Sequence, residues 1–189
     1  MTVADESLLN KVAAKLGEPP SYAEARVSGS LLTAAAASYG SQPLGDEVTQ
    51  PTGFDPAAAA LFEAVVESAF LVAHADGEFD DSEQRAFRHV VLAACGDRVA
   101  EAQMSALLAD LGDLLEEDGL EKRLSMVARA IVRPEQQREV LRMAALIAHV
   151  SGGVSTIERG VLERLAREFG LDEAATGQAL IEADRALSD

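Results

Sequence analysis

The sequence predicts an all-α protein, and three observations support this fold class. Alanine, the best helix former, dominates an apolar fraction of 48% in a chain of 189 residues. Aromatic residues make up only 4% of the chain, and apolar runs typical of strands are almost absent. Apolar residues also recur at helical spacing, as in Leu61, Phe62, Val65, Val66 and Ala69. We therefore expect a compact helical bundle of about seven helices around one core.

The first part of the chain differs from the rest. A short helix is expected over residues 6–16, followed by stop signals at Gly17, Pro19 and Pro20, and an Ala-rich helix over 22–39. The next stretch, GSQPLGDEVTQPTGFD, is dense in Gly, Pro and polar residues, which predicts a linker. We expect residues 1–52 to be an Ala-rich, partly helical segment, ordered only where it packs on the body or on a partner. Residues 53–189 are expected to form the helical domain.

The helical domain starts at Asp55-Pro56, an N-cap residue followed by proline at the first helical position. Pro134 marks a second helix start of the same kind. The acidic segment 110–121 (DLGDLLEEDGLE) is expected to be a junction between helices with a solvated face. After the first helix, the apolar pattern predicts helices at 83–94, 100–111, 121–133, 135–150, 158–169 and 172–187.

An internal match at a separation of 75 residues is the most informative feature of the sequence. The segment FLVAHADGEFDDSEQRAF (70–87) aligns without a gap with ALIAHVSGGVSTIERGVL (145–162). Two copies at so long a period predict a duplicated helix–corner–helix unit rather than a solenoid, which needs at least three repeats. The identical pairs are Leu71/Leu146, Ala73/Ala148, His74/His149, Gly77/Gly152 and Glu83/Glu158.

Each copy has a structural explanation. The shared glycine is expected to end the first helix in the left-handed conformation. A capping box then opens the next helix, formed by Asp80 with Glu83 in the first copy and by Ser155 with Glu158 in the second. Capping alone would therefore explain both shared glutamates.

The first corner carries more acid than capping requires. Asp76 follows the end of a helix, where the negative end of the helix dipole disfavours a carboxylate. A bound Ca²⁺ or Mg²⁺ would compensate, because hard cations prefer clusters of oxygen ligands. Glu158 would add one oxygen if the two corners face each other. The alternative is a solvated acidic turn without an ion. The candidate metal ligands are Asp76, Glu78, Asp80, Glu83 and Glu158.

His74 and His149 occupy matched positions before the two corners. Such a pair would suit a transition metal or a pH sensor. The alternative is structural, with each ring beside the core and hydrogen-bonded to backbone or a carboxylate. Cys95 is the only cysteine, so one chain cannot form a disulfide or a thiolate cluster, and we expect a buried, inert thiol.

Charge and missing motifs exclude several functions. A net charge of -16 argues against nucleic acid and against docking on anionic lipid. No secretory signal and no apolar run of about 18 residues is found, which predicts a cytoplasmic protein with no direct membrane insertion. No phosphate-binding loop, nucleophile elbow or zincin motif is present, so we do not expect an enzyme. Protein partners are expected instead.

The motifs AHADGEFDDSE and LIAHVSGGVSTIERGVLERLAREFGLD resemble the TerB-like family, which includes tellurite-resistance proteins and the N-terminal module of DnaJ-like membrane co-chaperones. The resemblance covers about residues 54–187 and includes the turn Phe169-Gly170-Leu171. It implies a bundle of about seven helices, an acidic site for a divalent metal, and a non-enzymatic part in stress-response complexes near the membrane. Asp76, Glu83 and Glu158 match the family's acidic positions, whereas Ser151 replaces an expected Asp.

Two functional hypotheses follow. The first is a cation-binding or metal-sensing interaction module in a stress-response complex of the tellurite-resistance type, for which ions should stabilise the fold. The second is a metal-free helical adaptor that binds a partner protein through its helices.

Overall fold

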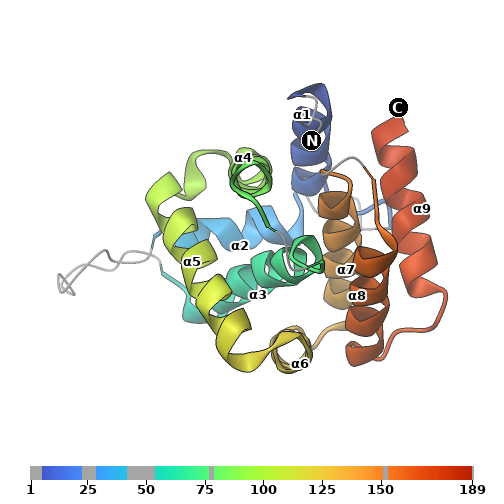
Figure 1. Ribbon diagram of the computed structural model, residues 1–189. Coiled ribbons are helices and arrows are strands. Elements are labelled where there is room, and N and C mark those ends of the chain that lie inside the picture. Colours follow the sequence, from blue (N-terminus) through green and yellow to red (C-terminus); the bar gives the residue numbers. More distant parts are fainter. Residues whose placement is uncertain (1–5, 23–28, 42–53, 77–78, 151–152, 189) are drawn as a thin grey trace.

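The computed structural model describes residues 6–22, 29–41, 54–76, 79–150 and 153–188. These residues form nine α-helices and one 3-10 turn, with no strand among them (Figure 1). The all-α prediction is confirmed, while the helix count over the described part of the chain is higher than the expected seven. Buried apolar side chains from all nine α-helices form one continuous core.

Two helices precede the segment that was predicted to be a linker. The first, α1 (Glu6–Gly17), has the expected bounds within one residue. The second, α2 (Leu31–Gly40), begins later than expected because Ser30 is its N-cap, accepting a hydrogen bond at Oγ from the Thr33 amide at 3.3 Å. The expected helical residues 23–28 lie outside the described residues, as does most of the predicted linker, 42–53.

Both N-terminal helices pack on the helical body. Leu16 of α1 is buried, and Tyr39 of α2 stacks on Phe62 with ring centroids 4.6 Å apart. Arg142 donates through Nη1 and Nη2 to the carbonyls of Lys15 and Glu18, at 3.3 and 3.1 Å, and so caps the end of α1. These contacts make the first helices part of the common core. The predicted domain boundary near residue 52 itself lies outside the described residues.

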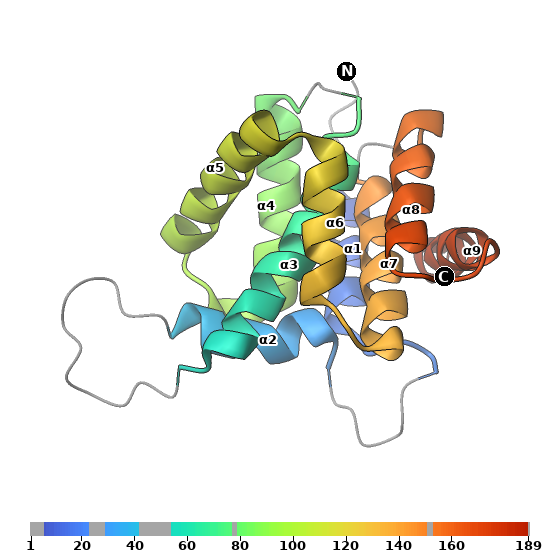
Figure 2. The same ribbon diagram turned by 90° about the horizontal axis from the view of Figure 1, so that it is seen from below.

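The long helix α3 (Pro56–Ala73) runs through the centre of the bundle, and Figure 2 shows it between α5 and α7. Asp55 is its N-cap, as predicted, accepting at Oδ1 from the Ala57 amide at 2.9 Å. Within the described ranges, α3 is the one helix whose length and composition would suit a membrane span. Because 61% of that span is buried inside the protein, we interpret α3 as a core helix.

The next helices correct one prediction. The segment 110–121 does contain the predicted junction between two helices, but the junction is confined to Gly119, because α5 continues beyond its expected end at residue 111, through Gly112 to Asp118. The helix ends at Gly119, whose positive φ of 75° is accessible to glycine, and the following helix starts one residue later. The bounds are α4 (Asp81–Cys95), a 3-10 turn η1 (Gly96–Arg98), α5 (Glu101–Asp118) and α6 (Leu120–Ala130). Cys95 is buried, as expected, and burial raises the pKa of its thiol to about 12.

The C-terminal helices complete the bundle on the other side of α3 (Figure 2). Pro134 opens its helix as predicted. The turn at Gly170 is a Schellman motif, in which the Leu171 amide donates to the Ala166 carbonyl at 3.0 Å. The bounds are α7 (Pro134–Ala148), α8 (Thr156–Glu168) and α9 (Ala175–Ser188).

Candidate functional site

The first corner joins α3 to α4. The capping box predicted there is confirmed: the Glu83 amide donates to Asp80 Oδ1 at 3.0 Å, and the Asp80 amide donates to Glu83 Oε2 at 3.1 Å. The hydrogen bonds that Asp80 accepts lower the pKa of its carboxyl, with Ser82 the main donor. Asp80 therefore stays ionised and committed to the start of α4. Two residues of this corner, Gly77 and Glu78, lie outside the described residues.

The second corner joins α7 to α8 in the same way. The Glu158 amide donates to Ser155 Oγ at 3.1 Å, and the Ser155 amide donates to Glu158 Oε2 at 2.7 Å, so this predicted capping box is also confirmed. Ser151 and Gly152 lie outside the described residues, and the left-handed role of the two shared glycines stays a prediction. The internal duplication likewise remains a hypothesis based on the sequence.

Glu158 of the second corner is close enough to the first corner for their charges to interact. Its side chain is buried, with a relative exposure of 7%, although it opens a helix. Burial is the main cause that raises the pKa of its carboxyl; Ser155 opposes the shift, and the negative charges of Asp76 and Glu83 add to it. Carboxylates from both copies therefore act on one another across the interface between α3–α4 and α7–α8.

His74 lies beside these acids as the C-cap of α3. Its ring packs against Phe70 and Phe79, with centroid distances of 5.4 and 5.6 Å. Burial lowers the pKa of the imidazole, and Asp76 and Glu83 only partly oppose that shift. Its Nδ1 atom is buried and has no hydrogen-bond partner among the described residues. His74 is thus a largely neutral side chain at the edge of an aromatic cluster.

His149 has different surroundings, although it is the matched C-cap of α7. Its Nδ1 lies 2.7 Å from the Ala145 carbonyl oxygen, and its Nε2 lies 2.8 Å from Asp184 Oδ1 on α9. His149 therefore has the hydrogen bonds to backbone and carboxylate that the structural alternative describes, whereas His74 Nδ1 has none among the described residues. The role of the pair in metal binding or pH sensing stays a prediction.

Asp76 and Glu83 of the first corner and Glu158 of the second are called the joined corners below. Their chemistry suits a hard cation more than a soft one. Asp76, Glu83 and Glu158 offer carboxylate oxygens, the ligands that Ca²⁺ and Mg²⁺ prefer. Over the described part of the chain, no group of three His, Cys, Asp or Glu side chains is already gathered closely enough to hold a metal ion. An ion would therefore have to draw these carboxylates closer together.

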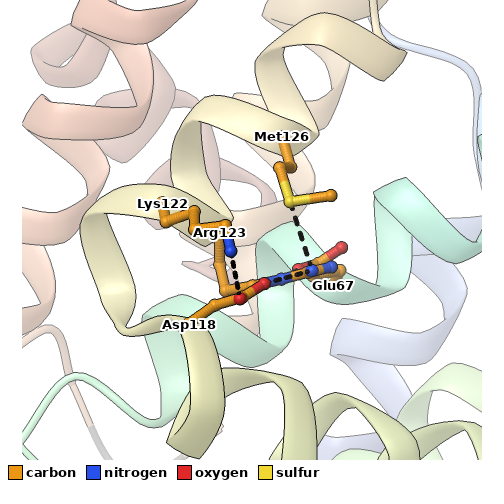
Figure 3. Close-up of polar contacts among 5 residues, drawn as sticks. All are labelled: Glu67, Asp118, Lys122, Arg123 and Met126. Carbon is orange, nitrogen blue, oxygen red and sulfur yellow. Dashed lines mark hydrogen bonds and ion pairs between the residues drawn. The ribbon is translucent and has the colours of Figure 1, made fainter.

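A second charged cluster was missed by the sequence reasoning (Figure 3). Arg123 of α6 donates through Nε to Glu67 Oε1 at 2.6 Å and through Nη1 to Asp118 Oδ2 at 3.1 Å, and all three side chains are at most 10% exposed. Lys122 holds the other oxygen of Asp118 at 2.5 Å. The available signal was Glu67 itself, an acid within the apolar run of α3 that needs a cation if it is buried.

Comparison with known proteins identifies the family. The model of the family described as tellurite resistance protein TerB matches residues 62–181, more than half of the chain, including both corners and both capping boxes. No curated protein and no solved structure matches the chain. The resemblance inferred from the corner motifs is thereby confirmed, and the chain belongs to the tellurite resistance protein TerB family.

Proposed function

We propose that this protein is a non-enzymatic interaction module that senses a divalent cation, Ca²⁺ or Mg²⁺, where its two corners meet. The observation that carries the proposal is the buried carboxylate of Glu158, held in the field of Asp76 and Glu83. A buried acid next to two like charges is unfavourable when ionised. A bound cation would offset both burial and repulsion.

The consequence of binding would be mechanical. Glu83 and Glu158 lie in the first turns of α4 and α8, so an ion shared between them would fix the positions of these two helices. The surface around them would then differ between the ion-free and ion-bound protein. We propose that a partner protein of a cytoplasmic stress-response complex, peripheral to a membrane, binds the ion-free and ion-bound forms with different affinity.

The test is thermal unfolding of EDTA-treated protein with added Ca²⁺ or Mg²⁺. A ligand that binds only the folded state raises the thermal midpoint. At a ligand concentration of 100 times the dissociation constant, it increases the free energy of unfolding by about 2.7 kcal/mol. We expect a saturable rise with one ion, reduced strongly in Asp76→Asn. Asp81→Asn is the matched control, because Asp81 is an exposed acid of the same corner that is not among the charges acting on Glu158. No rise, or an equal loss in both variants, would contradict the proposal.

Glu158→Gln is expected to stabilise the ion-free protein at neutral pH, by roughly 1 kcal/mol or about 2–4 °C in midpoint. Glutamine preserves the capping box but carries no charge. Because folding raises the pKa of Glu158 above its ordinary value of 4.5, the folded protein is favoured below that pH and loses this advantage as pH rises.

The measurement is the difference in midpoint between variant and wild type from pH 4.5 to 7, in EDTA. The difference should be small at the acid end and grow as pH rises. A constant or shrinking difference would show that ionised Glu158 does not destabilise the folded protein.

The second candidate is a metal-free adaptor. It is favoured by the capping boxes, which are complete without an ion, and by the lack of a ready three-ligand group among the described residues. It predicts that neither ion changes the midpoint, so the same titration decides between the two.

A further inference from the structure

A cavity of about 440 Å³ lies between α3 and α5, bounded at its ends by residues of α2 and α6. Figures 1 and 2 show α5 on one flank of α3, connected along the chain to α4 at its start and to α6 at its end. The volume is within the range of about 300–1,000 Å³ that is typical of sites for small molecules. This cavity shares no residue with the joined corners and goes beyond the proposed function.

One wall of the cavity is apolar. Leu107, Leu111 and Leu114 of α5 recur at helical spacing and line it together with two alanines. Leu107 and Leu111 are buried and Leu114 is half-buried. This wall would cover an apolar stem, since burial of apolar surface is favourable.

The polar groups of the cavity give it a negative charge. Its lining holds the carboxylates of Glu63, Glu67 and Asp110 against a single cation, Arg123. That guanidinium is already paired with Glu67 and with Asp118 outside the lining, and Glu67 raises its pKa further. The lining therefore carries more negative than positive charge, and Glu63 on α3 and Asp110 on α5 line the cavity from two different helices.

Tyr39 lines the cavity near both of these carboxylates. Its ring is fixed by stacking on Phe62, and its side chain lines the α2 end of the cavity. Burial raises the pKa of its hydroxyl, and Glu63 and Asp110 both add to that rise. Glu63 and Asp110 therefore place negative charge near the Tyr39 hydroxyl.

We propose that the cavity binds a small organic cation, a primary ammonium group carried on an apolar stem. The ammonium would lie between Glu63 and Asp110, with the Tyr39 hydroxyl as a further acceptor, because an ammonium has three donors and no acceptor. The stem would pack along the leucines of α5. Anions are excluded by the net negative lining, and a bare metal ion would leave the apolar wall unused.

The experiment titrates the full-length protein with n-hexylamine, n-hexanol and hexanoate, followed by NMR chemical shifts. We expect saturable binding of the amine with a dissociation constant of about 1 mM, as for a ligand of this size, and at least about 10-fold weaker binding of the uncharged and anionic analogues. Equal binding of amine and alcohol, or no saturation by the amine, would overturn the proposal.

Two variants place the cation. Glu63→Gln and Asp110→Asn should each weaken hexylamine binding by about 5-fold, as expected for loss of one of the two carboxylates that would hold the ammonium, Glu63 being half-buried and Asp110 exposed. Asp113→Asn is the matched control, since Asp113 is exposed on the same helix, outside the lining. Asp113→Asn should change the affinity by less than about 2-fold, because it alters the net charge as much as Asp110→Asn does but leaves the cavity lining unchanged. Equal weakening by Asp110→Asn and Asp113→Asn would mean general attraction to an acidic surface and would overturn the site.

Two further measurements test whether the amine binds inside the cavity and whether the true ligand is a lysine side chain of a protein. Ala106→Phe should abolish binding while the thermal midpoint is kept, because Ala106 lines the cavity from an exposed position of α5. N-acetyl-lysine methylamide carries the same ammonium within a peptide unit. If it binds more tightly than hexylamine, the cavity takes a lysine of a partner protein, and the assignment to a small molecule is wrong. The response of the joined corners to Ca²⁺ or Mg²⁺ should be unchanged in every variant, which separates the two proposals.

Discussion

Arg123→Met is expected to destabilise the protein by about 3–5 kcal/mol, lowering the thermal midpoint by about 10 °C. Among the cations of the described residues, Arg123 is the one that forms an ion pair with Glu67, at 2.6 Å and with less than 10% of either side chain exposed. Removing the guanidinium leaves a buried carboxylate without its charge partner. The same substitution frees Asp118, at the end of α5, from one of its two cations (Figure 3).

The double variant Glu67→Leu/Arg123→Met separates loss of charge pairing from loss of packing. A buried ion pair replaced by apolar side chains is often neutral or stabilising, so the double variant should recover most of the loss. Arg129→Met is the control, because Arg129 is exposed on the same helix and should change stability by less than about 0.5 kcal/mol. The measurement is chemical denaturation at constant pH. A double variant as unstable as Arg123→Met would show that packing, not charge, determines the effect.

The features that could be predicted from the sequence arise from interactions between residues that are close together along the chain. The N-cap Asp55 and both capping boxes involve residues at most three positions apart, so the spacing was sufficient to find them. The helical class followed from composition and periodicity for the same reason. At the candidate site, Glu83 and Glu158 were identified together with their capping roles.

The features that were missed depend on tertiary contacts or on weak local signals. Glu67 and Arg123 are 56 residues apart, and nothing in the spacing pairs them. The continuation of α5 was missed because Gly112 and the acidic run seemed to end a helix. Glycine in a helix interior is unfavourable by only about 1 kcal/mol, which the buried Leu111 before it and the half-buried Leu115 after it can offset. The true end at Gly119 is distinguished by its positive φ, which spacing does not reveal.

Gly40→Ala is expected to destabilise the protein by about 3 kcal/mol. Gly40 ends α2 where this helix meets the 3-10 turn η1, and a Cβ at this position would overlap the carbonyl oxygen of Arg98. The obstacle is backbone, so no side-chain rotation can relieve it. Gln103 of α5 also donates to the Gly40 carbonyl, at 3.4 Å, so a shift of α2 would disturb a third element. A loss of this size would show that the N-terminal helices pack on the body so closely that even a methyl group at position 40 is excluded.

Gly112→Ala is the matched control and should have the opposite sign. A Cβ at Gly112 meets no described atom within 4 Å, and its position inside α5 favours alanine by roughly 1 kcal/mol. Denaturant unfolding of the two variants beside wild type measures both effects. If Gly40→Ala were as stable as wild type, the close approach of α2 to η1 would be wrong, and the N-terminal helices would be held on the body without this backbone contact. A loss restricted to Gly40→Ala would instead show that the packing of the first two helices is specified at the level of the backbone.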